Sequence, residues 1–149
     1  MWARVLSKMR SHKLQRGAAA LEFALVFPVL LLLLVGIVDF GMLMSTQSVV
    51  ANAAREGART AALSNNAMAA QNAVTTAIAG LPGATNAGTT VTVGCTTAAG
   101  DPCSLSDTTP DTGGTVTVTL NYVHTWLSPV LLGLAPTITL HGTSFMRIE

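Results

Sequence analysis

Few residues of this chain have the types and the spacing that chemistry requires. Ser144 stands in the segment GTSFM, which is not the G-x-S-x-G turn that exposes a hydrolase nucleophile. His124 and His141 lack the spacing of an H-E-x-x-H zinc helix, and no phosphate-binding glycine loop is present. The aspartates within 101–111 lack the order and the terminal glutamate of a calcium loop, so we expect them in solvated turns. We therefore assign no catalytic residue and expect no metal and no cofactor.

Glu22 is the residue whose surroundings are chemically unusual. Between Ala18 and Val38 it is the only ionised side chain, and this stretch of 21 residues reaches the roughly 20 residues needed to cross about 30 Å of hydrocarbon. A carboxylate near the membrane interior costs about 2.5 to 3.5 kcal/mol, so it needs a partner or water. An α-amine freed at Ala18, on the same chain or on a neighbour, is one such partner. A place at the hydrated interface is the alternative.

The residues before this apolar run indicate how it crosses the membrane. Basic residues beside a span stay on the cytoplasmic side, which predicts a cytoplasmic N-terminus and an exported segment after Asp39. A nucleic-acid site is the other use of basic residues, but no folded scaffold accompanies them, so we expect no nucleic-acid partner. The chain of 149 residues has room for one such anchored domain and little more. The basic residues, with no Asp or Glu among them, are Arg4, Lys8, Arg10, Lys13 and Arg16.

The two cysteines, Cys95 and Cys103, both lie in the segment expected to be exported. An oxidising compartment allows them to form a disulfide, which we predict. Because they do not form a C-x-x-C motif, we expect the bond to be structural.

Small residues recur every four positions in the Ala-rich stretch Thr46–Leu63, which favours a helical stalk beyond the bilayer. Such rows let helices approach closely, so they could form a contact face for a partner, or they could face the domain's own sheet. The sequence leaves both readings open. We predict that Gly57→Leu impairs assembly more than folding, because a bulky residue would block close approach of helices on this face. The two rows are Ala53, Gly57, Ala61 and Ala54, Ala58, Ala62.

The polar residues Ser64–Asn66 can interrupt this helix and cap a second one, which Gly80 and Pro82 would stop near Ala79. An unbroken helix from Ala18 would be roughly 93 Å long, more than the small domain could cover. We therefore expect a bend or a break, with a bend near Pro28.

Beyond position 81 the hydrophobic period changes to two, which predicts three strands packed on the helix. Gly142 would mark a bulge or bend in the last strand. The apolar segment Trp126–Leu134 either folds under the sheet or offers a contact patch. The inward residues are Val91 and Val93, then Val116, Val118, Leu120 and Tyr122, then Ile138, Leu140, Met146 and Ile148.

The junction RGAAALEF, Arg16–Phe23, resembles the leader junction of type IV pilin-like precursors. The run RGAAALEFALVFPVLLLLLVGIVDFG, with NAAREGARTAA at 52–62, resembles the TadE-like minor pseudopilins of the Flp (tight adherence) pilus system. The closing TSFMRIE is similar to that family's last strand. The resemblance implies cleavage between Gly17 and Ala18 by a prepilin peptidase, with Glu22 and Phe23 setting the register of assembly. It also implies other pseudopilins, the pilus assembly machinery and the lipid bilayer as partners.

Together these observations predict an α+β, pilin-like fold in which a long N-terminal transmembrane and stalk helix packs on a small antiparallel sheet. The expected function is that of a minor pseudopilin in the bacterial inner membrane, for assembly of a pilus that serves adhesion, with the filament itself as a further location. The alternative is an unprocessed, single-pass interaction protein of the cell envelope. The expected parts are a basic cytoplasmic leader at 1–17, a transmembrane helix at 18–41, a helical stalk at 42–80 and a β-rich extracytoplasmic domain at 81–149.

Overall fold

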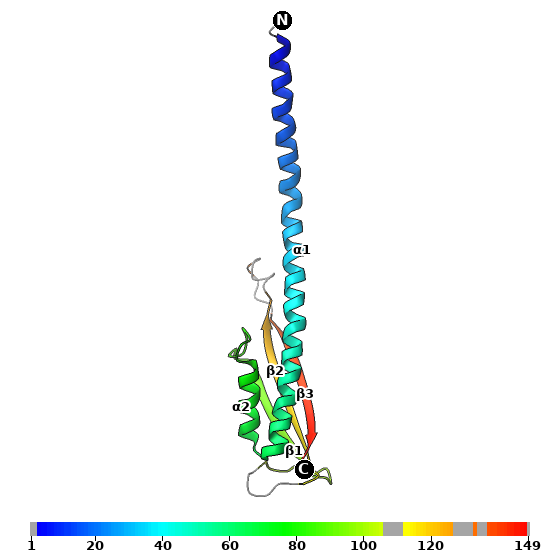
Figure 1. Ribbon diagram of the computed structural model, residues 1–149, viewed down its shortest axis with the longest axis vertical. Helices are drawn as coiled ribbons and strands as arrows, with labels where there is room; N and C mark the ends of the chain where they lie inside the picture. The colour runs from blue at the N-terminus through cyan, green and yellow to red at the C-terminus, as the bar shows by residue number, and fades with distance from the viewer. Residues whose placement is uncertain (1–2, 106–111, 127–132, 134–136, 149) are drawn as a thin grey trace. The chain divides into compact units, whose positions relative to one another are not determined.

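The computed structural model describes residues 3–105, 112–126, 133 and 137–148, with side chains from Ala19 onward (Figure 1). Two helices precede three strands, which confirms the expected α+β class. The chain divides into two compact units, Met1–Asp39 and Phe40–Glu149. The elements are α1 (Ala3–Ser64), α2 (Ala67–Ile78), β1 (Thr90–Thr96), β2 (Thr115–Thr125) and β3 (Thr137–Arg147).

The apolar part of the first unit has the composition of a helix that crosses a membrane, where each backbone N–H and C=O group must bond within the segment. Large apolar side chains lie exposed all around α1 from Leu21 to Val38, which is the pattern of a helix surrounded by lipid. Ala19–Ser64 is the one helical stretch in the described part of the chain that is long and apolar enough to cross a membrane. Helix α1 continues through Pro28 without a break, so the predicted interruption of the helix lies farther along the chain.

That departure is at Asn65, where the sequence predicts an interruption. Asn65 takes a left-handed backbone conformation with φ of 49°, which ends α1, and its N–H donates to the Ala61 carbonyl at 2.8 Å. The side-chain oxygen of Asn66 then accepts from the N–H groups of Met68 and Ala69, at 2.9 and 3.1 Å. This N-cap satisfies two backbone donors at the start of α2. The predicted break and second helix are confirmed.

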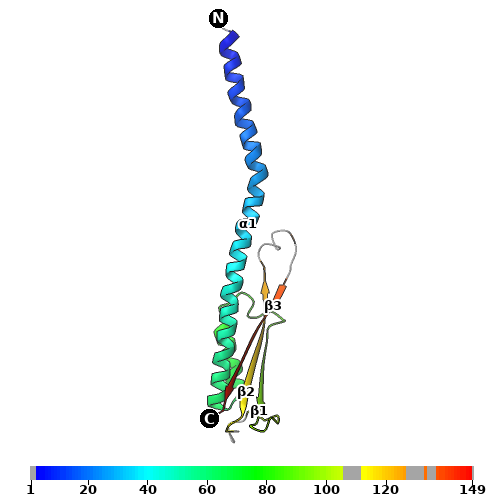
Figure 2. The ribbon, with the colours of Figure 1, turned by 90° about the vertical axis from the view of Figure 1, so that its right-hand side faces the viewer.

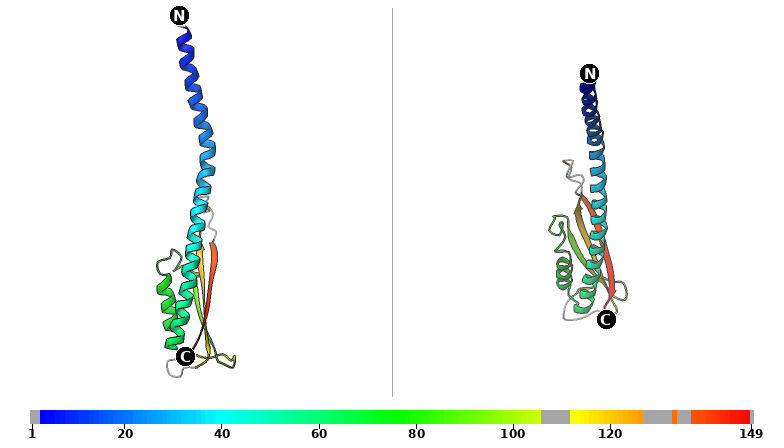
Figure 3. Two further views of the ribbon diagram at one scale, coloured as in Figure 1. Left: turned by 45° about the vertical axis from the view of Figure 1, so that its right-hand side comes forward. Right: turned by 45° about the horizontal axis from the view of Figure 1, so that its top comes forward.

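The second unit packs two helical segments on one face of a three-stranded antiparallel sheet, in the order β1-β2-β3 (Figures 1 and 2). Figure 3 shows α2 alongside the C-terminal part of α1. Alternate residues of the central strand β2 point to the helices and are fully buried, as the period of two predicts. The buried residues of β2 that form the core are Val116, Val118, Leu120 and Tyr122.

Strand β3 differs from expectation at Gly142. Pairing with β2 is continuous from Arg147 to Thr137, so there is no bulge at Gly142. A Cβ atom there would lie 2.8 Å from the carbonyl oxygen of Val50, so glycine is needed because α1 approaches the strand backbone closely. Of the residues of this strand expected to point inward, Leu140 and Ile148 are buried, but Ile138 and Met146 are exposed, because the helices cover the middle of β3 and not its two ends.

Candidate functional site

The two rows of small residues on α1 face the interior of the second unit. All six residues are buried within it. A Cβ atom on Gly57 would lie 2.4 Å from Cγ2 of Val74 in α2 and 3.3 Å from Cγ1 of Val118 in β2. The structure therefore supports the second of the two readings, contact with the chain's own sheet and helix. It also reverses the expectation that Gly57→Leu spares the fold.

The opposite side of this part of α1 is polar and exposed. Arg55 donates to the side-chain oxygen of Asn52 at 2.8 Å, and Arg59 lies 3.9 Å from Glu56. Exposed pairs of this kind contribute at most about 0.5 kcal/mol to the helix, so these charges are not needed for folding. The exposed face with residues Asn52, Arg55, Glu56 and Arg59 is thus one part of the stalk that a partner can reach.

The expected cleavage and register residues all belong to the first unit. Gly17 and Ala18 lie within α1. Glu22 and Phe23 lie on its exposed surface, and the rings of Phe23 and Phe27 pack with their centroids 5.3 Å apart. Cleavage at Gly17 and the part of Glu22 in assembly stay predictions.

Cys95 and Cys103 form a disulfide, as predicted. Cys95 is in β1, and the N–H of Cys103 donates to its carbonyl oxygen at 3.1 Å. Between them, Thr97 and Asp101 close a turn through a backbone bond of 2.7 Å from the Thr97 N–H to the Asp101 carbonyl. The disulfide therefore stabilises a hairpin-like turn at the end of the edge strand β1.

Breaking this disulfide is expected to destabilise the second unit without unfolding it. A closed loop of about nine residues contributes about 2.5 kcal/mol by restricting the unfolded chain. The Cys95→Ser, Cys103→Ser double variant should show a lower urea midpoint than the parent chain. Thiol labelling of intact envelopes without reductant should find no free thiol, and quantitative labelling of both cysteines would contradict the bond.

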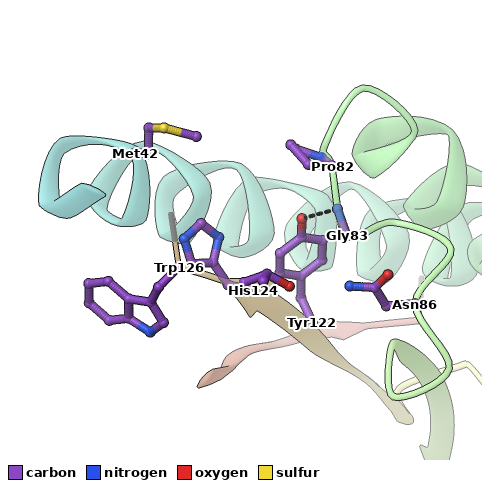
Figure 4. A pocket seen from close by; sticks show the side chains of 8 residues that line it. Met42, Pro82, Gly83, Asn86, Tyr122, His124 and Trp126 are labelled. Atoms are coloured by element: carbon purple, nitrogen blue, oxygen red, sulfur yellow. Dashed lines mark hydrogen bonds between the residues drawn. The ribbon is translucent and has the colours of Figure 1, made fainter. Parts of the chain in front are cut away.

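A pocket of about 270 Å³, which the sequence did not predict, lies in the second unit where β2 ends (Figure 4). The Tyr122 hydroxyl accepts from the N–H of Gly83 at 2.7 Å, and the amide of Asn86 donates to the Val123 carbonyl at 3.3 Å. These bonds fix the loop after α2 against β2. The signal in the sequence was the inward parity of β2, which continues from Tyr122 to His124 and Trp126. The lining residues are Met42, Pro82, Gly83, Asn86, Tyr122, His124, Thr125 and Trp126.

Most of the apolar segment Trp126–Leu134 lies outside the described residues, so its predicted burial or use as a contact patch stays a prediction. Its first residue, Trp126, is described and is partly exposed at the pocket.

Comparison with known proteins finds a similarity for the N-terminal part of the chain. The family model for TadE-like proteins matches residues 17–59, which include Gly17, Glu22, the apolar run and the start of the stalk. No curated protein and no solved structure matches the chain. The β-sheet and its pocket lie outside the matched segment. The resemblance to TadE-like proteins is therefore confirmed for residues 17–59.

Proposed function

We propose that this chain is a minor pseudopilin that a prepilin peptidase cleaves between Gly17 and Ala18 and that then takes part in assembly of an Flp-type pilus. The observation that carries the proposal is the position of the family match, which begins at Gly17 and leaves the basic residues before it outside. In this proposal 1–17 is the leader, 18–41 the span, 42–80 the stalk and 81–149 the β-rich domain, exported from the inner membrane.

The charges and the glycine support this order of events. The basic leader holds the N-terminus in the cytoplasm, which places Gly17 at that face of the membrane. A peptidase needs an extended backbone, so α1 must open locally at the bond to be cut. Glycine weakens a helix by about 1 kcal/mol relative to alanine and has no Cβ to obstruct a narrow cleft, so opening is easiest at Gly17.

The role proposed for the mature chain is structural and not catalytic. The small-residue rows are occupied by the chain's own sheet, so contact with other pseudopilins falls to the exposed polar face of α1, at Asn52, Arg55, Glu56 and Arg59. The competing proposal is an unprocessed anchored protein with an envelope partner. It needs the same span and domain, and it differs in keeping the leader.

Intact-mass measurement of the protein extracted from membranes of piliated cells separates the two proposals. Removal of 17 residues from 149 leaves 132, with the N-terminal sequence AAALEF and the whole apolar run retained. A chain that still begins at Met1 would favour the unprocessed anchor. A chain that lacks everything through Val38 would identify the apolar run as an ordinary signal peptide, and either result would refute this assignment.

A further inference from the structure

The pocket at the end of β2 has apolar walls and hydrogen-bond donors without a carboxylate. The side chain of His124 is about nineteen-twentieths buried, and its ring is directed into the space between Met42 and Tyr122 (Figure 4). Trp126 meets it edge-on, with ring centroids 6.1 Å apart and an interplanar angle of 78°. Thioether, indole and imidazole groups thus enclose a space that is accessible from outside.

Hydrogen bonding at the pocket leaves donors available. Tyr122 is fully buried and its hydroxyl accepts from Gly83, so it anchors the loop and forms the floor of the pocket. Asn86 uses one of its two amide hydrogens on Val123, which leaves the second. The imidazole of His124 supplies at least one further N–H. A ligand that suits these donors offers acceptors attached to an apolar chain.

The distance from the membrane follows from the number of residues along the chain. Met42, in the pocket wall, comes three residues after Asp39, where the apolar run ends. Three residues span about 4.5 Å in a helix and at most about 11 Å when extended. Met42 is therefore within about 11 Å of Asp39 in any backbone conformation. The headgroup layer on each side of the hydrocarbon is roughly 5 to 8 Å deep. Part of the pocket wall therefore lies in or next to that layer.

Tryptophan and tyrosine are enriched at this depth because their rings are apolar at one end and polar at the other. We propose that the pocket binds a phospholipid of the leaflet next to the exported domain. The first methylenes of an acyl chain lie against Met42 and Trp126. The ester oxygens, which can only accept hydrogen bonds, take them from Asn86 and His124. The proposal rests on membrane anchoring of the chain and not on cleavage at Gly17.

Fluorescence quenching by brominated lipids tests this site in the full-length chain. Trp2 and Trp126 are the only two tryptophans, so Trp2→Phe leaves Trp126 as the single reporter. In vesicles of phosphatidylcholine, bromines at the 6,7 positions of the acyl chain should reduce Trp126 emission at least twofold. Bromines at the 11,12 positions should quench less. Equal emission in brominated and plain vesicles would overturn the proposal.

A matched control uses Phe145, an exposed residue of β3 that pairs with Thr117. Eight residues of β2 separate Thr117 from Thr125 at the pocket, which is about 26 Å of strand. A Phe145→Trp reporter, with Trp2 and Trp126 replaced by phenylalanine, should be quenched by aqueous iodide and not by bromolipid. Bromolipid quenching of both reporters alike would show nonspecific adsorption and would also overturn the site.

A third variant distinguishes the pocket from mere proximity to lipid. Met42 is partly exposed, so Met42→Glu is expected to fold, and its carboxylate repels the phosphate and esters of a lipid in the pocket. Quenching of Trp126 should fall by at least half. Unchanged quenching would mean that Trp126 touches lipid outside the pocket, which contradicts the proposal. Leader cleavage, read by intact mass, should be unaffected by this variant, so failure of the lipid site and failure of the proposed function are separate results.

Discussion

Gly57→Leu is expected to unfold the second unit, because no space exists for a side chain at this position. Even a Cβ atom would lie 2.4 Å from Cγ2 of Val74, a fully buried residue whose branched side chain cannot turn away easily. One added methyl in a packed core costs about 1 to 3 kcal/mol, and the gain in helix propensity over glycine returns only about 1 kcal/mol. Leucine adds three more carbons against α2 and β2. The net loss should exceed about 3 kcal/mol, a large share of the stability of a small domain.

The measurement is pulse proteolysis in urea of the full-length chain in detergent. Gly57→Ala should lower the midpoint, and Gly57→Leu should be cleaved even without urea. Gly41→Ala is the matched control, since Gly41 lies on the same helix and the same unit with no atom within 4 Å of an added Cβ. It should keep or raise the midpoint. Val74→Ala in the Gly57→Ala background should restore part of the loss by removing the clash.

A native midpoint for Gly57→Leu, together with lost cross-links to other pseudopilins, would contradict the internal packing. That pair of results would return the small-residue rows to a partner interface.

Local signals predicted much of the fold. The break at Asn65 and the cap at Asn66 follow from short polar side chains that bond to nearby backbone, which needs no knowledge of the rest of the chain. The strands follow from the alternation of valine and threonine, and their inward residues in β2 are the core. The disulfide followed from two cysteines in a segment that the basic N-terminal residues predict to be exported.

The remaining features depend on which surfaces meet, and periodicity does not carry that information. A row of small residues indicates that something packs closely against the helix. The sequence does not say whether Gly57 contacts another chain or, as in the structure, Val74 of the same chain. Gly142 suggested a bulge, yet its role is to let Val50 of α1 reach the strand. The pocket joins Met42 to Trp126 across 84 positions of sequence, so it exists only once helix, loop and strand are assembled.

Gly17→Leu and Glu22→Leu are expected to stop the pathway at different steps, which is the sharpest consequence of the proposed function. Leucine at position 17 introduces a bulky Cβ substituent at the bond to be cut and strengthens the helix by about 1 kcal/mol where it must open. Both effects oppose cleavage. This variant should accumulate at the full length of 149 residues in the membrane.

Glu22→Leu should be trimmed nearly as well as the parent chain, because position 22 lies beyond the bond and leucine inserts into lipid more readily than glutamate. Its defect comes later. Burial of the Glu22 charge costs about 2.5 to 3.5 kcal/mol, and attraction to a freed Ala18 amine on an adjacent subunit would offset part of that cost. The same attraction would fix the axial register of the two subunits. Leucine removes that attraction, so recruitment into assemblies should fall by tenfold or more.

The two steps are measured in the same membranes: intact mass reports cleavage, and cross-linking to partner pseudopilins reports recruitment. Glu22→Gln, which keeps the shape without the charge, should behave like leucine; normal recruitment of Glu22→Gln would show that the charge does not set the register.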